Sequence, residues 1–398
     1  MSECEARTTG VGGLHAFSPT RPLLLVTDFA PDAKGGGAVI LRSLLTDDDR
    51  ASVVWVTLSP CAADGNGRVI SLARTTRRDP FLDATTRLGE LRRGVEAAAR
   101  ASGATAAWIV AHGAAVRLAP FLVSRSRPVH VTVHDDPAWG WALLTRRCLP
   151  LAPIFARDLG SALRAARSVD VVSANMARRY RTRYGAAPSI IHRGLVGPIR
   201  PAPPYTSADE LTIAVLGSIY GGRELKVLAS AVGMAAARFG IGARLIVIGG
   251  VADRTVRAMC PPDVALEAPG HLDEVAGVAR LAEAFLLYLC YPFARRGHVL
   301  RTTSFPTKLS TYVLAARPLL LHMPIESGVA DLGVRDSPYA NIWHSLSVED
   351  GAAIIGALWE DSRMRASFHA QAEQVRGHYF ELRQHRATLL RVLNALAT

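Results

Sequence analysis

The chain has 398 residues, of which 49% are hydrophobic and 20% are charged. This length suits two domains of roughly 150 to 200 residues each, and the composition excludes a disordered or low-complexity chain. No apolar stretch reaches the roughly 18 residues that cross a bilayer. The N-terminal sequence MSECEARTTG lacks the basic and apolar regions of a secretory signal. We therefore expect a cytoplasmic protein with no transmembrane helix.

The positive charge is concentrated in the first half. Residues 1–200 contain 27 basic and 16 acidic residues, a net +11, whereas residues 201–398 contain 19 and 18, a net +1. A basic surface attracts phosphates, anionic lipid headgroups and nucleic acids alike. Since no nucleic-acid-binding motif accompanies the charge, we expect no nucleic acid partner, and we predict an acceptor-side role or a peripheral contact with the inner face of an anionic membrane. A merely solubilising arginine-rich surface is the alternative.

Short apolar runs alternate with helical patterns through the first half. The runs are RPLLLVTDF (21–29), SVVWVTL (52–58), AAWIVAHG (106–113) and PVHVTVHDD (128–136). The segments between them, such as RLGELRRGVEAAARA, have the spacing of amphipathic helices. Apolar strands that alternate with helices are typical of a parallel sheet buried on both faces. We predict a Rossmann-like, doubly wound α/β domain over residues 20–200.

A proline-rich stretch, GPIRPAPPYTSADE (197–210), separates this pattern from a second one. Its prolines interrupt both periodicities and mark a linker. Further apolar runs at 211–218, 243–250, 284–292 and 317–324 predict a second Rossmann-like domain over residues 206–375. Residues 376–398 place four leucines near one helical face, and we predict that this helix docks back toward the first domain. The two parallel sheets are expected to face each other across a cleft.

The segment TTSFPTKLSTYVLAARPLLLHMP (302–324) has the pattern of a helix start followed by a strand. Pro306 suits a first helical turn, where its missing NH costs nothing. The NH groups and the positive dipole end of such a helix bind phosphate, and Lys308 adds a full charge. The pattern predicts a diphosphate site, although it also describes an ordinary capped helix with a surface lysine.

This segment resembles the (S/T)xPxK helix, turn and strand in the donor domain of many retaining GT-B glycosyltransferases, those similar to glycosyltransferase family 4. FAPDAKGGGAVILRSLL (29–45) is similar to the N-terminal PP-x-GG loop of that family. SVDVVSANMARRYRTRYGAAPSIIHRGL (168–195) resembles the end of its first domain, and LTIAVLGSIYGGRELKVLASAV (211–232) the start of its second. The resemblance implies the GT-B fold and transfer of a sugar from a nucleotide-sugar donor, with UDP or GDP as the carrier. It also implies retention of anomeric configuration and no metal or cofactor beyond that donor.

The resemblance assigns donor-binding roles in the second half. It places the donor phosphates at Gly217 and Ser218, with Arg223 and Lys308 as cations. Thr311 stands where the family commonly has a glutamate that binds the ribose hydroxyls. The single hydroxyl of threonine cannot accept hydrogen bonds from both ribose hydroxyls as the two oxygens of a carboxylate do. The predicted donor contacts are Gly217, Ser218, Arg223, Ser304, Lys308 and Thr311, with Glu326 and Ser327, directly after the apolar run 317–324, as alternative ribose or sugar contacts. Ordinary solvated positions are the alternative for Arg223, Glu326 and Ser327.

Glycines and a His-Asp pair are the candidates in the first half. Gly35, Gly36 and Gly37 let the backbone approach a ligand closely, which predicts an acceptor or phosphate loop or, alternatively, a flexible loop. His134 and Asp135 end a predicted strand, where parallel sheets bind ligands, and we predict that they are catalytic. His134 could orient a sugar or acceptor hydroxyl, or act as a general base in an inverting variant; a structural histidine is the alternative.

Two other features are interpreted as structural. His112 fits a core hydrogen-bonding histidine as well as a site residue, and the acidic run Asp47 to Asp49 is interpreted as a loop charge run.

No metal site is predicted. The five cysteines are widely spread and never form CxxC, which argues against a disulfide framework or zinc site.

The leading function is a glycosyltransferase that uses a glycan, a lipid-linked molecule or a small molecule as acceptor. The first alternative, suggested by Thr311, is a catalytically weak GT-B-like binding or partner subunit. The second is a nucleotide-sugar epimerase, which would need carboxylates that the sequence does not identify. The sequence has no GxSxG or GxxxxGK(S/T) motif to support a hydrolase or a phosphate-loop NTPase.

Overall fold

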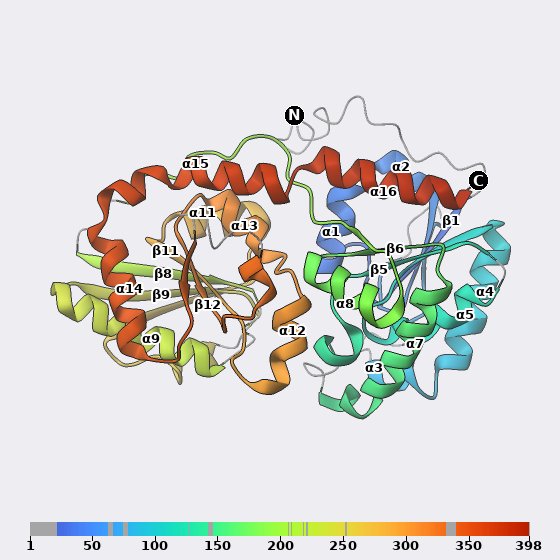
Figure 1. Cartoon of the computed structure of the whole chain (residues 1–398), viewed down its shortest axis with the longest axis horizontal. Coiled ribbons are helices and arrows are strands. Elements are labelled where there is room, and N and C mark those ends of the chain that lie inside the picture. The colour runs from blue at the N-terminus through green and yellow to red at the C-terminus, as the bar shows by residue number, and fades with distance from the viewer. Residues whose placement is uncertain are drawn as a thin grey trace. The chain divides into compact units, whose positions relative to one another are not determined.

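The computed structural model in Figure 1 describes residues 22–62, 67–74, 79–125, 127–141, 146–205, 207, 209–217, 219, 222–250, 253–331 and 340–397. The chain divides into two compact units. The first contains the chain as far as Val196, with Thr302–Phe305 and Phe380–Thr398. The second contains Gly197–Arg301 and Pro306–Tyr379. Each unit is built around a parallel sheet.

The sheet of the first unit has the strand order β3-β2-β1-β4-β5-β6-β7. All residues of β1, β2, β4 and β5 are buried, as the continuous apolar runs in the sequence require. The chain passes from β1 outward to β2 and β3, and then returns to β4 on the other side of β1. The strands are β1 (Leu23–Thr27), β2 (Val53–Thr57), β3 (Val69–Ser71), β4 (Ala106–Val110), β5 (Val129–Val133), β6 (Ser168–Val171) and β7 (Ser189–Ile190).

Amphipathic helices cover this sheet. On α4, Leu88, Leu91 and Val95 are buried at helical spacing, while Arg93 and Arg100 are exposed. Ser173 caps α8, because its side chain accepts a hydrogen bond from the NH of Met176. The helices are α1 (Gly36–Leu44), α2 (Asp47–Ala51), α3 (Pro80–Ala84), α4 (Leu88–Ser102), α5 (Ala119–Val123), α7 (Ala152–Ala165), α8 (Ala174–Tyr184) and α16 (Leu382–Ala397). Short 3₁₀ or π turns are η3 (Gly113–Leu118), η4 (Pro137–Trp141) and η5 (Arg146–Leu151).

Helix α16 packs within the first unit, against α1, β4 and β5. Its buried Arg386 forms an ion pair with Asp49 and donates a hydrogen bond to the carbonyl of Leu44 at 2.7 Å. The interpretation of Asp47 to Asp49 as a loop charge run was wrong. These residues form the first turn of α2, where Thr46 and Asp49 make a capping box. The carboxylate of Asp49 is buried because Arg386 compensates its charge.

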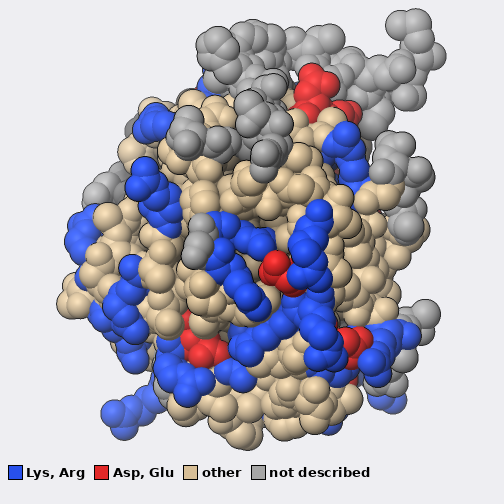
Figure 2. All heavy atoms as spheres, turned by 90° about the vertical axis from the view of Figure 1, so that its right-hand side faces the viewer, with Lys and Arg blue, Asp and Glu red and all other residues tan. Residues whose placement is uncertain are grey.

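Basic side chains gather on one face of the first unit. Figure 2 shows this face, which includes the region of α4 and α5 at the right of Figure 1, with far more Lys and Arg than Asp and Glu. Arg93, Arg100 and Arg125 are exposed. The guanidinium carbons of Arg92 and Arg125 lie 5.7 and 4.7 Å from the centroid of the Phe121 ring. We call Arg92, Arg93, Arg100 and Arg125 the α4–α5 basic face.

The sheet of the second unit has the order β10-β9-β8-β11-β12-β13. Its strands are β8 (Glu210–Leu216), β9 (Gly242–Ile248), β10 (Val264–Gly270), β11 (Leu286–Cys290), β12 (Leu319–His322) and β13 (Ala340–Trp343). The helices are α9 (Gly222–Phe239), α10 (Asp253–Arg257), α11 (Glu274–Ala282), α12 (His298–Thr303), α13 (Lys308–Ala315), α14 (Val348–Glu360) and α15 (Ser362–Tyr379). Short 3₁₀ turns are η6 (Arg295–Gly297) and η7 (Gly328–Asp331).

The prediction of two doubly wound parallel sheets is confirmed. Strand β10 was not predicted, because in VALEAPG only Val264 is buried and no apolar run marks the strand. None of the helices in the described parts of the chain has both the length and the apolar character needed to cross a membrane.

Candidate functional sites

The predicted phosphate loop of the second unit begins at Gly217, directly after β8. Gly217 has φ +78°, in the left-handed region that favours glycine, and its NH donates to the carbonyl of Ile248 at 2.7 Å. A Cβ placed on Gly217 would lie 3.9 Å from Cε and 4.0 Å from Nζ of Lys308. The structure therefore brings Gly217 and Lys308 together. Ser218 lies outside the described residues.

Lys308 is the first residue of α13. The N-cap residue Thr307 makes no side-chain capping hydrogen bond, and the first turn has no acidic residue. Burial lowers the pKa of Lys308 to about 8, against an opposing effect of Cys290. The lysine is therefore still mostly protonated at pH 7. A positive charge at a helix N-terminus without an acidic neighbour is a favourable environment for a phosphate group.

Tyr312 holds this lysine in place from one helical turn further along α13. Its hydroxyl accepts a hydrogen bond from the NH of Leu216 at 2.8 Å and donates to the carbonyl of Tyr288 at 2.7 Å. Because Leu216 precedes Gly217, these bonds fix α13 relative to the glycine. Sequence reasoning missed Tyr312, because its partners Leu216 and Tyr288 are distant from it in sequence. Thr311, beside it, is half-buried.

Glu326 and Ser327 follow β12 and differ in their surroundings. The carboxylate of Glu326 accepts hydrogen bonds from Nε and Nη2 of the buried Arg301 at 3.0 and 2.6 Å. These bonds hold the pKa of Glu326 below its usual range. The hydroxyl of Ser327 is buried and has no hydrogen-bond partner among the described residues. Glu326 is thus already paired with Arg301, whereas Ser327 offers an unsatisfied group after the strand.

Arg223 and Ser304 are the two remaining predicted donor residues of this part of the chain. The side chain of Arg223 is exposed in the first turn of α9. Ser304 belongs to the first unit, where its hydroxyl donates to the carboxylate of Asp135 at 3.0 Å. The segment from Ser304 to Lys308 is thus divided between the two units.

In the first unit, His134 follows β5 and is buried. Burial lowers the pKa of His134 to about 4, so its imidazole is neutral at pH 7. Its Nδ1 has no hydrogen-bond partner in the part of the chain that the structure describes. A Cβ placed on Gly37 would lie 3.0 Å from this nitrogen and 2.7 Å from Cε1 of Phe29, so the glycine is needed for the close approach. A neutral imidazole with so low a pKa is better suited to hydrogen bonding than to acting as a general base.

Gly35 is the only one of the three predicted loop glycines that precedes α1, because Gly36 and Gly37 form the start of that helix. Gly35 is the N-cap of α1 and has no side chain that could cap the helix. The first turn of α1 contains no acidic residue. Arg42 donates to the carbonyls of Pro31 and Ala33 at 2.6 and 2.7 Å, which braces the loop. The structure therefore places a helix N-terminus beside Nδ1 of His134.

Two acidic residues follow His134. Asp135 is half-buried and accepts the hydrogen bond from Ser304. Asp136 is buried and accepts hydrogen bonds from the Tyr180 hydroxyl and the NH of Ala138, each at 3.1 Å. Asp136, which was not predicted, fixes the turn after β5, while Asp135 holds the segment around Ser304.

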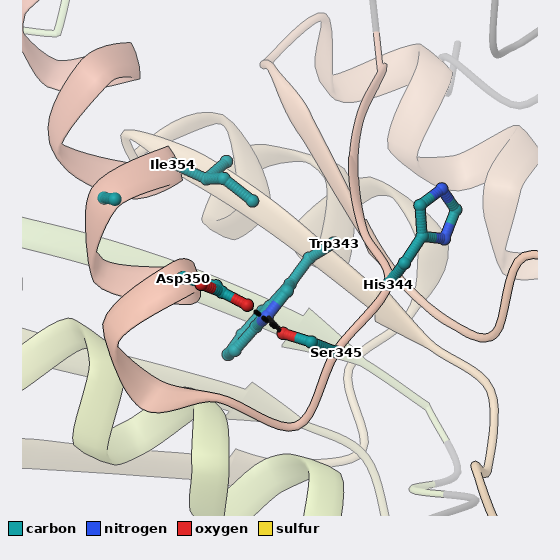
Figure 3. A pocket seen from close by; sticks show the side chains of 6 residues that line it. Trp343, His344, Ser345, Asp350 and Ile354 are labelled. Carbon is teal, nitrogen blue, oxygen red and sulfur yellow. Dashed lines mark hydrogen bonds between the residues drawn. The ribbon is translucent and has the colours of Figure 1, made fainter.

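A separate pocket of about 420 Å³ opens at the end of β13. Its lining residues are Trp343, His344, Ser345, Asp350, Ala353 and Ile354. Figure 3 shows the chain of hydrogen bonds from Trp343 to Ser345 at 3.1 Å and from Ser345 to Asp350 at 2.6 Å. None of the predicted site residues lines it. Its polar side chains are satisfied within the second unit, since Nδ1 of His344 also lies 3.0 Å from the carbonyl oxygen of Met323.

Comparison with known proteins yields matches by structure. No family model matches the chain, and no curated protein matches it by sequence. Sucrose-phosphate synthase from Thermosynechococcus elongatus aligns with a TM-score of 0.70 and 13% identity, over 94% of this chain and 99% of that one.

Two further structures are similar over comparable lengths. Anabaena HepE, in complex with UDP and glucose, aligns with a TM-score of 0.65 and 14% identity over 94% of this chain and 100% of its own. WaaG, a glycosyltransferase involved in lipopolysaccharide biosynthesis, aligns with a TM-score of 0.61 and 13% identity over 93% of this chain and 99% of its own. At these identities the likeness establishes the fold, which is the GT-B fold of two Rossmann-like units.

Proposed function

We propose that the protein is a glycosyltransferase that moves a sugar from a nucleotide-diphosphate sugar to an acceptor hydroxyl. The donor binds the second unit, and a glycan, a lipid-linked molecule or a small molecule binds the first. The observation that carries this proposal is the placement of Lys308, at the start of α13, beside Gly217. The similar structures support it, since one is a sucrose-phosphate synthase, one contains UDP and glucose, and one is a glycosyltransferase.

The proposed site matches the charge that develops in such a reaction. As the bond from the anomeric carbon to the diphosphate breaks, negative charge accumulates on the leaving oxygen. Lys308 and the N-terminus of α13 would stabilise that charge, in the role that a metal ion has in other enzymes. We therefore propose a metal-independent transfer. Retention of anomeric configuration is proposed on the sequence resemblance alone.

A binding subunit without appreciable activity is the second candidate. The observation that favours it is Thr311, which lies half-buried on α13 three residues after Lys308 and carries no carboxylate. Such a protein would bind the nucleotide-sugar without turning it over. Measurements of binding and turnover on the same preparation separate the two functions.

Nucleotide binding is tested by a thermal-shift screen with UDP, GDP, ADP and dTDP. A nucleotide at about 100 times its dissociation constant stabilises the folded state by roughly 2.7 kcal/mol. We expect one of the four to raise the melting temperature of the parent protein, and Lys308→Ala to reduce that rise. If none of the four shifts the melting temperature at millimolar concentration, the donor site is wrongly assigned.

We further propose that the α4–α5 basic face holds the protein at an anionic membrane surface. Each basic residue near such a surface contributes about 1 kcal/mol at most, and salt screens the attraction. Replacing Arg93 and Arg125 with alanine should therefore weaken binding to vesicles containing phosphatidylglycerol by up to about 30-fold. Cosedimentation at two salt concentrations measures this.

The matched control is Arg254→Ala with Arg257→Ala, because these two arginines are exposed on α10 in the second unit. It removes the same charge and is expected to leave vesicle binding nearly unchanged. If the two double variants lose vesicle binding equally, or if vesicle binding is insensitive to salt, the α4–α5 basic face is not a specific membrane contact.

A further inference from the structure

The turn after β1 lies at a topological switch point of the first unit. Strands β2 and β3 lie on one side of β1, and β4 to β7 lie on the other. In open parallel sheets, ligands bind beyond the carboxyl ends of the strands where this reversal occurs. The residues directly beyond the ends of β1 and β4 include Asp28 and His112.

Asp28 and His112 form a pair at this point. Nδ1 of His112 lies 3.5 Å from Oδ2 of Asp28. The side chain of Asp28 is 5% exposed, whereas that of His112 is 25% exposed, so a ligand can reach the imidazole but not the carboxylate behind it. The buried carboxylate therefore lies on one side of the imidazole, close enough for electrostatic attraction, while part of the ring stays accessible.

The turn that carries Asp28 is braced. Ser59 Oγ donates to the carbonyl of Asp28 at 2.7 Å, and Thr27 Oγ1 donates to the carbonyl of Phe29 at 2.6 Å. The ring of Phe29 meets that of His112 edge to face, with centroids 6.4 Å apart. The pair is therefore held on two rigid strand ends.

A second histidine with an unsatisfied ring nitrogen lies near the same pair. Nδ1 of the buried His134 has no hydrogen-bond partner among the described residues, and it faces Gly37 in the first turn of α1. His134 is also close enough to His112 for the charge of His112 to affect its pKa. A buried polar atom without a partner is rare in folded proteins and is commonly satisfied by water or a ligand.

We propose that Asp28, His112 and His134 form the acceptor-binding site, in which His112 accepts a hydrogen bond from the hydroxyl that receives the sugar. Asp28 is a positioning residue that holds the ring of His112, and Nδ1 of His134 binds a neighbouring hydroxyl of a polyhydroxylated acceptor. This inference rests on the proposed function and assigns its acceptor side to residues that include His112, for which the sequence analysis left a structural role equally open.

The test compares transfer with donor binding in the full-length protein. UDP-glucose, GDP-mannose, ADP-glucose and dTDP-glucose are the donors, and a panel of p-nitrophenyl hexosides and hexose 6-phosphates supplies the acceptors. His112→Ala is expected to lower kcat/KM for the acceptor by about tenfold or more, with an unchanged nucleotide-induced thermal shift. His112→Gln, which keeps a hydrogen-bond acceptor, should recover part of the loss.

Asp28→Asn provides a readout that a general loss of stability would not give. The carboxylate of Asp28 lies 3.5 Å from Nδ1 of His112, and the charge of His112 acts on the buried His134. Without the negative charge, the pKa of His112 should fall, and the acidic limb of the kcat/KM profile should move to lower pH. An acidic limb unchanged in Asp28→Asn would contradict the positioning role.

The possible failures are distinguishable. Acceptor kcat/KM within twofold of the parent in His112→Ala overturns the acceptor site and leaves the proposed function intact. An equal loss of nucleotide affinity in that variant also overturns it, because His112 would then serve the donor. A parent protein that neither binds a nucleotide nor transfers a sugar would overturn the proposed function, and the acceptor site with it.

Discussion

Replacing Arg386 with alanine is expected to lower the free energy of unfolding of the first unit by about 3 to 5 kcal/mol. Arg386 and Asp49 are both buried, with side chains 2% and 0% exposed. Loss of the guanidinium leaves a carboxylate inside the protein with an uncompensated charge, which costs far more than a surface pair. It also removes the hydrogen bond to the carbonyl of Leu44. Urea denaturation read by peptide-resolved hydrogen exchange on α2 and α16 measures the change.

Arg383→Ala is the matched control, because Arg383 lies on the same helix with an exposed side chain. Arg383→Ala should change the free energy of unfolding by no more than about 0.5 kcal/mol. The double variant Asp49→Asn, Arg386→Met should be more stable than Arg386→Ala, because it leaves no buried charge. If Arg386→Ala lowers the free energy of unfolding by less than about 1 kcal/mol, the Asp49–Arg386 pair does not hold α16 on the first unit.

Replacing Lys308 with alanine is expected to weaken donor binding by about 10- to 150-fold. The change removes one charge-assisted hydrogen bond to the diphosphate, worth about 1.5 to 3 kcal/mol. Tyr312 should keep α13 in place in the variant, since the tyrosine hydroxyl bonds to Leu216 and Tyr288 without using the lysine. Isothermal titration with the nucleotide found in the thermal-shift screen measures the affinity.

Two further measurements check the chemistry assigned to Lys308. Lys308→Arg should recover only part of the affinity, because a planar guanidinium does not replace a compact ammonium. Burial has lowered the pKa of the lysine to about 8, so the charged form is lost as the pH rises through this value. Donor affinity of the free protein should therefore fall above pH 8, and the fall should be absent in Lys308→Ala. Affinity within twofold of the parent in Lys308→Ala would contradict the assignment.

The fold was largely predictable from sequence because its central strands are fully buried. Such strands appear as continuous apolar runs, as in Leu23–Thr27 and Leu286–Cys290. Strand β10 lacked this signal because most of its residues are partly or fully exposed. The assignment of Thr302–Phe305 to the first unit had no signal in local sequence, since it depends on long-range contacts such as that between Ser304 and Asp135.

The candidate site was predictable where a backbone requirement marks it. Gly217 and Gly37 are such positions, because one has a positive φ and the other is approached by Phe29 and His134. The supporting residues were not predictable. Tyr312, Arg301 and Asp28 act through partners distant in sequence, and their residue types alone do not distinguish them from ordinary core or surface positions.

The most direct test of the proposed function is the transfer of labelled sugar from a nucleotide-sugar. The parent protein is incubated with each of the four donors and the acceptor panel in the presence of EDTA, and the products are identified by mass spectrometry. The expected product is heavier than one acceptor by one sugar residue, forms without added metal, and is reduced at least about tenfold in Lys308→Ala. Nucleotide binding without any transferred sugar would contradict the proposal that the protein is a glycosyltransferase and would support the proposal that it is a binding subunit.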